Sequence, residues 1–112
     1  MTGVHLIADV YNINNAELLA NIDGVEPLMI KIIEKGQLNV LGDIKHQFKP
    51  IGATILYLLS ESHLSIHTYP ERNYCAIDLY CCNSLINMGD ILEVIYNYFD
   101  GNCVIMKKII ER

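Results

Sequence analysis

Residues 60–82 read SESHLSIHTYPERNYCAIDLYCC, and this stretch decides the fold. Within residues 63–69, polar or aromatic side chains alternate with apolar ones, which is the period of a half-buried strand. Residues 74–82 alternate in the same way, and the four residues between the two runs are typical of a tight turn. The stretch therefore predicts an antiparallel hairpin with one apolar face and one polar face.

The predicted polar face gathers side chains that can carry chemistry. Its members are His63, Ser65, His67 and Tyr69 on the first strand and Tyr74, Ala76, Asp78, Tyr80 and Cys82 on the second. Because the two strands are neighbours, these groups could converge on one surface. His63 and His67 lie roughly 13 Å apart at the rise of a strand, so they do not chelate one metal ion. From this pattern alone, the sequence indicates a polar-faced sheet with candidate nucleophiles.

Outside the hairpin, the apolar periodicity predicts the remaining elements. Strands are expected over residues 4–11, 38–48, 53–60 and 102–110, and a short helix over residues 16–21. One amphipathic helix follows Gly24 and ends at Gly36, with Pro27 in its first turn, and a second covers residues 88–99 and ends at Gly101. The strand over residues 38–48 is expected to be half-buried.

This order of elements predicts an α/β (α+β) fold of one domain. It runs strand, helices, four strands, helix, strand, and hairpin links favour antiparallel pairing. We therefore expect a two-layer sandwich, in which a mainly antiparallel sheet carries both helices on one face. The opposite face is expected to be polar and to hold the site.

Composition restricts the class of function. The chain has 112 residues, 52% of them hydrophobic, a net charge of −5 and no Lys/Arg cluster, which argues against a nucleic-acid partner. No signal peptide or membrane span is visible, so a cytoplasmic location is expected. The four cysteines include no C-x-x-C pair, so a zinc site is not expected. We expect the cysteines to be reduced thiols.

Residues 61–71, ESHLSIHTYPE, resemble the signature of the small bacterial and archaeal S-adenosylmethionine decarboxylases, approximately E-S-H-x-[ST]-I-H-[ST]-aromatic-P-E. The resemblance continues through residues 5–9 (HLIAD) and through His46, Phe48, Pro50, Gly52, Tyr74, Ala76, Asp78 and Cys82. It therefore covers most of the chain.

The resemblance implies a self-processing proenzyme. The Ser62 hydroxyl attacks the carbonyl carbon of Glu61, and the single domain of residues 1–112 is cleaved into chains 1–61 and 62–112. Ser62 becomes a pyruvoyl group, the only cofactor implied, and no metal is implied. This group forms a Schiff base with S-adenosylmethionine, and the decarboxylated product is the aminopropyl donor for spermidine synthesis.

The resemblance also implies roles for the matching residues. His67 moves the proton in processing, Thr54 assists it through its hydroxyl, and Cys82 protonates the carbon after decarboxylation. Phe48 and Tyr69 contact the adenine and the sulfonium, for which flat aromatic faces are suited. Glu71 binds the ribose hydroxyls. A homodimer of processed protomers, with the sites near the interface, is implied as well.

Two alternatives remain open at this point. A relative with the same pyruvoyl chemistry could decarboxylate arginine or ornithine, and Asp9, Asp78 and Glu71 are candidates to bind the basic end of such a substrate. A non-processing homologue could instead serve as a regulatory subunit. A test for self-cleavage distinguishes the regulatory homologue from the enzymes. A comparison of substrates distinguishes an arginine or ornithine decarboxylase from an S-adenosylmethionine decarboxylase.

Overall fold

Alternating apolar and polar residues form the strands of the sheet. The computed structural model describes residues 3–82 and 85–112. Within those ranges the strands are β1 (Val4–Tyr11), β2 (Val40–Gln47), β3 (Ala53–Leu59), β4 (Ser62–Tyr69), β5 (Tyr74–Cys81) and β6 (Val104–Glu111). They form one sheet in the order β2-β3-β4-β5-β1-β6, and each adjacent pair is antiparallel.

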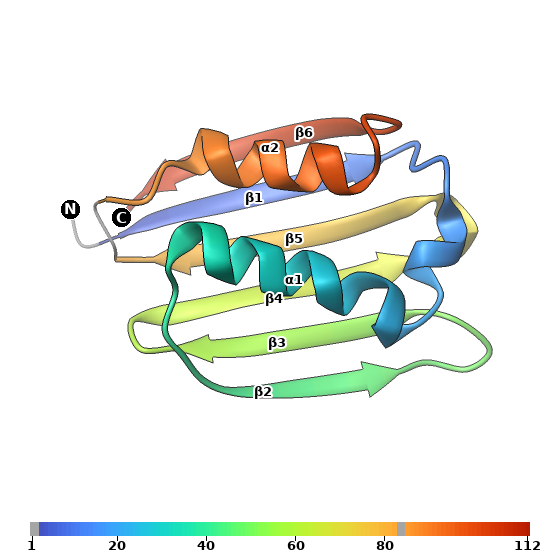
Figure 1. Ribbon diagram of the computed structural model, residues 1–112, viewed down its shortest axis with the longest axis horizontal. Coiled ribbons are helices and arrows are strands. Elements are labelled where there is room, and N and C mark those ends of the chain that lie inside the picture. Colours follow the sequence, from blue (N-terminus) through green and yellow to red (C-terminus); the bar gives the residue numbers. More distant parts are fainter. Residues whose placement is uncertain (1–2, 83–84) are drawn as a thin grey trace.

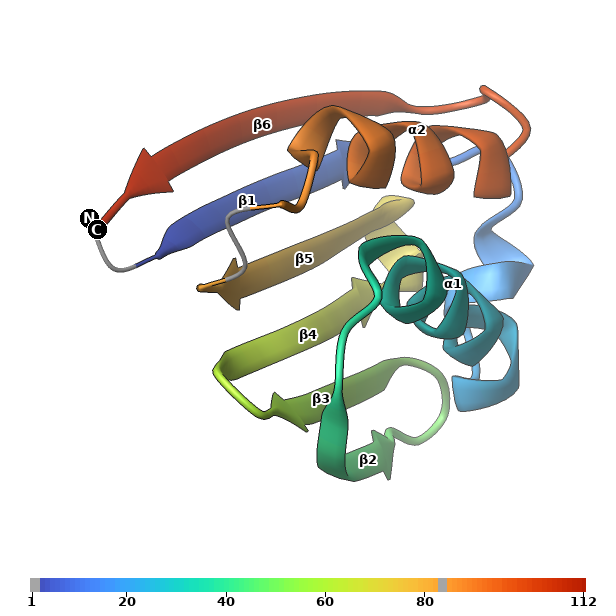
Figure 2. The same ribbon diagram turned by 60° about the vertical axis from the view of Figure 1, so that its left-hand side comes forward.

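Two α-helices cover one face of this sheet (Figure 1). They are α1 (Ile22–Gly36) and α2 (Met88–Tyr98), while two 3-10 helices, η1 (Ala16–Leu19) and η2 (Pro70–Arg72), lie in the connections. Figure 2 shows both helices on the same side of the sheet, with its other face uncovered. The predicted two-layer sandwich with helices on one face is therefore confirmed.

The core lies between the helices and the sheet. Alternate strand residues point into it, and side chains such as Leu6, Ile66 and Leu79 are fully buried. Burial of one such side chain stabilises the fold by roughly 1.5–3 kcal/mol. The buried partners on the helices are Val25, Leu28, Met29 and Ile32 of α1 and Met88, Ile91 and Ile95 of α2.

The uncovered side of the sheet, which we call the open face, carries the other set of alternate residues. Register pairs such as His67 with Thr54 place their side chains on it together. It is polar in its centre, as predicted, but apolar toward its sides, where Ile44, Leu58 and Met106 are 73%, 58% and 62% exposed. These apolar side chains are exposed to solvent in a single chain.

The prediction of a half-buried strand over residues 38–48 was wrong. The register shifts between Val40 and Gly42, so Leu41 is an extra residue and the alternation reverses at that point. Val40 pairs with Leu59 on the core side, whereas Ile44 pairs with Leu56 on the open face. β2 is also an edge strand, and most of its residues are exposed.

Helix α1 begins before Gly24, which sequence periodicity had marked as the residue preceding the helix. The Oε1 atom of Gln47 accepts a hydrogen bond of 2.9 Å from the backbone N–H of Ile22, which satisfies a free donor at the helix start. Pro27 consequently lies in the second turn instead of the first. The end was predicted correctly: α1 ends at Gly36, and Gln37 follows in a left-handed conformation with a φ of 51°.

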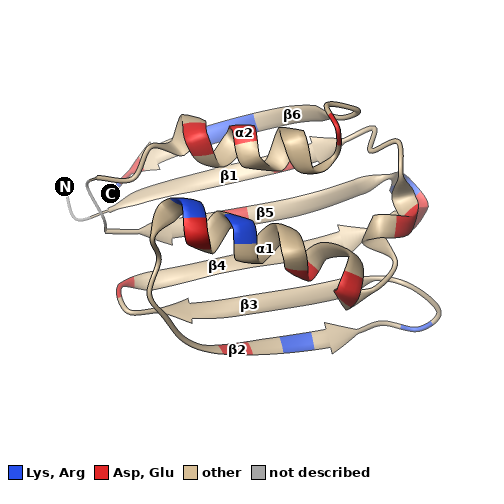
Figure 3. Ribbon diagram, viewed as in Figure 1, with Lys and Arg blue, Asp and Glu red and all other residues tan. Residues whose placement is uncertain are grey.

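Charged residues are spread over the molecule. Figure 3 shows the Lys and Arg positions on α1, β2, β6 and the connections, among acidic positions on the same elements and elsewhere. In residues 3–82 and 85–112, neither helix has the length and apolar character that crossing a bilayer requires.

Candidate active site

Ser62 is the first residue of β4, directly after the turn from β3. The turn is fixed by the backbone, because the N–H of Ser60 donates a 2.9 Å hydrogen bond to the carbonyl oxygen of Asn39. The Ser62 hydroxyl is in contact with the carbonyl oxygen of Glu61, to which it can donate a hydrogen bond. The hydroxyl oxygen thus lies against the peptide unit whose carbonyl carbon it must attack in an acyl shift.

Cys82 lies at the same end of the sheet as Ser62. It directly follows β5 and lines a hollow of about 400 Å³ together with Glu61, Ser60 and Leu59. Cys82 is exposed, whereas Cys81 is 4% exposed and packs in the core. Cys81 also borders this hollow, but strand alternation turns its side chain toward the core and leaves the Cys82 side chain exposed.

The other two cysteines have the character of structural residues. Burial raises the pKa of the Cys75 thiol far above its ordinary value and also raises the pKa of Cys103. A thiol in such surroundings is a poor nucleophile. In the part of the chain that the structure describes, none of the four cysteines forms a disulfide.

Thr54 and His67 form a pair at the opposite end of the sheet. They are register partners on β3 and β4, and the Thr54 hydroxyl lies 3.0 Å from Nδ1 of His67. This hydrogen bond orients the imidazole on the open face, where the ring is exposed. A positioned histidine of this kind suits proton transfer near neutral pH.

Phe48 is held beside this pair by its neighbours. Its backbone N–H donates a 2.8 Å hydrogen bond to the carbonyl oxygen of Gly52, and the Gln47 amide donates to three carbonyl oxygens around the same loop. The Phe48 ring packs edge-on against His46, with centroids 4.5 Å apart, and is 47% exposed. A fixed but accessible aromatic ring is what base stacking requires.

Tyr69 and Glu71 complete this second group. Tyr69 ends β4, and Glu71 lies in η2 directly after it. Both side chains are exposed. With Tyr11, Arg72, Tyr74 and Ala76, Tyr69 lines a hollow of about 450 Å³.

The structure therefore divides the predicted site residues into two groups. Glu61, Ser62 and Cys82 lie at one end of the sheet, whereas Thr54, His67, Phe48, Tyr69 and Glu71 lie at the other. Ser62 and His67 are five positions apart on β4, a distance of roughly 16 Å at the rise of a strand. One copy of the chain does not bring the two groups together.

Sequence reasoning left one ordered pair on the open face unassigned. Nε2 of His5 lies 3.3 Å from Oδ2 of Asp78, and the His5 ring also packs near His63 and Tyr80. The alternation in β1 placed His5 on one face, but the pairing of β1 with β5 was needed to bring it to Asp78. Among the described residues, no group of three or more His, Cys, Asp or Glu side chains is arranged to bind a metal ion.

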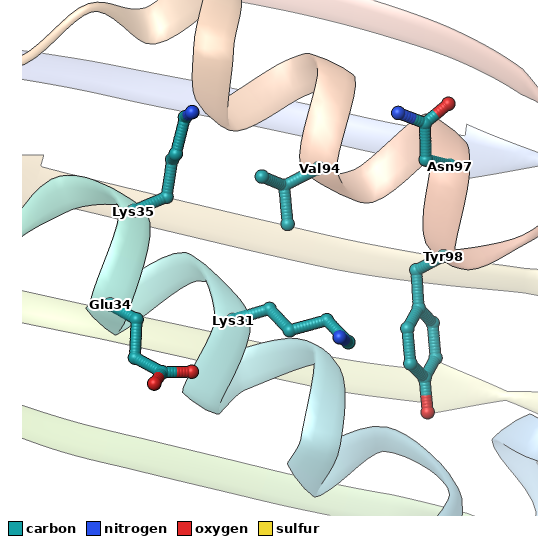
Figure 4. A pocket seen from close by; sticks show the side chains of 6 residues that line it. All are labelled: Lys31, Glu34, Lys35, Val94, Asn97 and Tyr98. Carbon is teal, nitrogen blue, oxygen red and sulfur yellow. The ribbon is translucent and has the colours of Figure 1, made fainter.

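A larger cavity lies far from these residues, on the helix layer. It has a volume of about 550 Å³ and is lined by Lys31, Glu34, Lys35, Val94, Asn97 and Tyr98 (Figure 4). Its walls come from α1 and α2, on the other side of the sheet from the open face. None of the predicted site residues lines it, so cavity size does not mark the candidate active site here.

Comparison with known proteins agrees with the signature around Ser62. A sequence model described as S-adenosylmethionine decarboxylase matches residues 4–112. The chain belongs to the S-adenosylmethionine decarboxylase family. This finding confirms the resemblance that the motif of residues 61–71 indicated.

Individual members of the S-adenosylmethionine decarboxylase family match over most of their length. The S-adenosylmethionine decarboxylase proenzyme of Picrophilus torridus is 35% identical over 107 residues, covering 96% of this chain and 82% of the relative. Proenzyme 2 of Bacillus cereus is 36% identical over 108 residues, covering 96% and 87%. The crystal structure of the Aquifex aeolicus adenosylmethionine decarboxylase matches with a TM-score of 0.88 at 29% identity, over 99% of this chain and 90% of that one.

Proposed function

We propose that this chain is a proenzyme that cleaves itself between Glu61 and Ser62 and then decarboxylates S-adenosylmethionine. The observation that carries the proposal is the contact of the Ser62 hydroxyl with the Glu61 carbonyl, since attack on that peptide needs an adjacent β-hydroxyl. Family membership supports the reaction, because pyruvoyl-dependent decarboxylases of this family are made as proenzymes.

Processing at Glu61 and Ser62 balances without any external reagent except water. Ser62 Oγ bonds to the Glu61 carbonyl carbon as the peptide C–N bond breaks, so an ester replaces the amide and the hydroxyl proton passes to the amine. Removal of the α-proton of residue 62 then breaks the Cβ–O bond and releases Glu61 as a terminal carboxylate. The dehydroalanine left behind takes up water and loses ammonia. His67, oriented by Thr54, is the proposed base for the α-proton.

The residues around Ser62 fit the chemistry of a pyruvoyl group. When present, that group supplies a ketone that holds the substrate amine and an electron sink for the loss of carbon dioxide. Cys82 is the proposed acid, and its exposed thiol holds a proton for the substrate α-carbon at the Ser62 end of the sheet. We also propose a cytoplasmic location, and the lack of disulfides among the described cysteines is compatible with it.

The separation of the two groups supports a homodimer with shared sites. His67 serves Ser62 only if it comes from a second copy, since the two residues are roughly 16 Å apart in one chain. Packing of two open faces supplies this arrangement when the two-fold axis lies in the interface and crosses the strands. Each strand then lies over its own copy in the opposite direction, so the Ser62 end of β4 lies over the end of the copy that carries His67.

The apolar sides of the open face fit the same interface. On this axis, position 65 of β4, halfway between the groups, lies near its copy. Leu56 and Ile44 share the row of Ser65 through the register of β2, β3 and β4, so they lie near their copies as well. Both are exposed in a single chain, and face-to-face packing of the sheets buries them. The same packing removes water from both proposed sites.

The substrate assignment is supported by the carboxylates of the open face. Asp9 accepts a 2.6 Å hydrogen bond from the Tyr74 hydroxyl, and Asp78 is paired with His5. Two of the three carboxylates that could bind the basic end of arginine or ornithine are therefore already engaged. Phe48 and Glu71 remain exposed and suit an adenine and a ribose.

Mass spectrometry and a carbon dioxide assay test the proposed function. The purified protein should separate under denaturing conditions into a chain ending at Glu61 and a chain beginning with a pyruvoyl group at position 62. Processed protein should release carbon dioxide from S-adenosylmethionine in preference to arginine or ornithine at equal concentration. A chain that stays intact after prolonged incubation contradicts the proposal and favours the regulatory homologue. Preference for a basic amino acid contradicts the substrate assignment alone.

The exposed and the buried thiol give a matched pair of variants. Cys82→Ala should leave cleavage intact and lower turnover by roughly 10²–10⁴-fold, the usual value of a general acid. Cys81→Ala removes the same atom from the core, so it should lower the melting temperature and leave turnover per folded enzyme near that of the parent. Steady-state decarboxylation and thermal melts check both. Full turnover in processed Cys82→Ala contradicts the role proposed for this thiol.

A further inference from the structure

Three tyrosines form a stacked row across the open face, at the end that carries His67. They are Tyr69, Tyr74 and Tyr11, which lie side by side on β4, β5 and β1, and we call them the tyrosine row. The ring centroids of Tyr69 and Tyr74 are 5.5 Å apart at an interplanar angle of 23°. Those of Tyr74 and Tyr11 are 4.9 Å apart at 25°. The row therefore presents a set of aromatic rings in fixed orientation.

A hydrogen bond fixes the position of Tyr74, the middle residue of the tyrosine row. The Tyr74 hydroxyl donates its 2.6 Å hydrogen bond to Asp9 on the neighbouring strand. Burial, with a further contribution from this hydrogen bond, raises the pKa of Tyr74 well above its ordinary value. The phenol therefore stays neutral, and the ring keeps the electron-rich face that attracts a cation.

Arg72 already places a cation on this row. Its guanidinium carbon lies 4.9 Å from the ring centroid of Tyr69 and 5.9 Å from that of Tyr74. The turn that carries Arg72 is fixed, because the Asn73 backbone N–H donates to the Pro70 carbonyl and the Asn73 amide donates to Ile13. Among the described residues, no carboxylate lies within ion-pair distance of the guanidinium.

The row and Arg72 together line the hollow of about 450 Å³ beside Glu71. In the proposed dimer, this hollow lies at the end of the sheet that faces the partner's Ser62. S-adenosylmethionine carries a positive sulfonium, and a second positive charge at the same ring face opposes its binding. If the substrate displaces the guanidinium from the aromatic face, the cation–π contact of Arg72 is lost, which weakens substrate binding.

We propose that Arg72 determines the affinity for the cationic substrate by occupying the ring face of Tyr69 that the sulfonium would otherwise contact. The inference rests on the proposed function, in which Tyr69 belongs to the substrate site. Arg72 acts as an intrachain competitor, so its removal strengthens binding of a sulfonium. A neutral thioether of the same shape does not gain from the change, since it has no charge to place on the ring.

Equilibrium binding tests the proposal without depending on turnover. The Ser62→Ala chain, with and without Arg72→Gln, is titrated calorimetrically with S-adenosylmethionine and with neutral S-adenosylhomocysteine. Arg72→Gln should lower the Kd for S-adenosylmethionine roughly 2- to 5-fold, the usual value of a partly exposed cation–π contact, and leave the Kd for the thioether unchanged. In processed enzyme made from chains without the Ser62→Ala substitution, Arg72→Gln should lower KM for S-adenosylmethionine similarly and leave kcat unchanged.

Three further variants separate this effect from general charge. Lys35→Gln, on the helix layer, makes the same change in net charge away from the row and should leave both Kd values unchanged. Arg72→Lys keeps a cation and should retain most of the parent Kd. In a Tyr69→Leu background, Arg72→Gln should no longer tighten binding of S-adenosylmethionine, because the contested ring is gone.

Specific outcomes overturn the proposal. The proposal is wrong if Arg72→Gln leaves the Kd for S-adenosylmethionine unchanged or raises it. It is also wrong if Arg72→Gln lowers the Kd for the thioether equally, or if Lys35→Gln lowers the Kd for S-adenosylmethionine equally. These results leave the proposed function standing as long as the Ser62→Ala chain binds S-adenosylmethionine. If that chain binds neither compound and the parent neither cleaves nor releases carbon dioxide, the proposed function has failed as well.

Discussion

Ser62→Ala should give only the full-length chain, with no cleavage after Glu61 and no decarboxylation. The substitution removes the oxygen that contacts the Glu61 carbonyl, and no other group can form the ester that leads to elimination at the same residue. Without the β-oxygen, neither chain scission nor a pyruvoyl group is chemically available. The loss should be complete instead of partial, and denaturing mass spectrometry after prolonged incubation measures it directly.

Ser60→Ala is the matched control for this experiment. Ser60 lies on the other side of Glu61 in the same turn and is exposed, but its hydroxyl precedes the scissile peptide. It should therefore process normally. Ser62→Cys keeps a nucleophile with a β-heteroatom and should still allow cleavage. If Ser62→Ala cleaves at the same bond, or if Ser60→Ala is the variant that fails, the processing mechanism proposed here is wrong.

The hairpin of β4 and β5 shows why much of the fold could be predicted from the sequence. Each strand has a strict alternation, and a one-residue slip would bury His67 and expose Ile66, so the pattern specifies the register as well as the strands. Residues 70–73 joined the strands as a turn, and Asn73 adopts the left-handed conformation that such a turn uses. Local pattern and tertiary packing agree here.

β2 shows where the same reasoning fails. Its apolar residues share one parity in the sequence, but the extra residue at Leu41 turns Val40 and Ile44 to opposite faces. A bulge has no periodic signature, and an edge strand is not held to one face by burial. The start of α1 was also missed, because the group that satisfies Ile22 is the side chain of Gln47, distant in sequence.

The residues of the candidate site could be predicted from the sequence motif. The motif did not predict that these residues divide between two ends of the sheet. The motif of residues 61–71 names Ser62 and His67 together, since they are close in sequence. A strand, however, carries residues five positions apart roughly 16 Å from one another. The distance argument that excluded a metal site between His63 and His67 applies equally to Ser62 and His67. This separation along the strand is the reason for the proposal that sites are shared between copies.

Decarboxylation by mixed dimers should distinguish active sites shared between two chains from active sites within one chain. Cys82→Ala should be impaired in turnover and His67→Ala in processing. Co-expression of the two chains should restore decarboxylation. In a mixed dimer, one site combines both substitutions, but the other combines an intact Ser62 and Cys82 from one chain with His67 from the other. With random pairing of equal amounts, about a quarter of all sites should be intact.

Tandem purification with two different tags isolates the mixed dimer, in which about half of the sites should be intact. Decarboxylation by this sample, compared with each homodimer, gives the measurement. Co-expression of Cys82→Ala with Ser62→Ala is the control, because both substitutions lie at the same end of the sheet and neither site in that mixed dimer is complete. If each active site lies within one chain, both combinations stay inactive. Recovery only in the pair of Cys82→Ala with His67→Ala requires that the two ends of the open face meet across the interface.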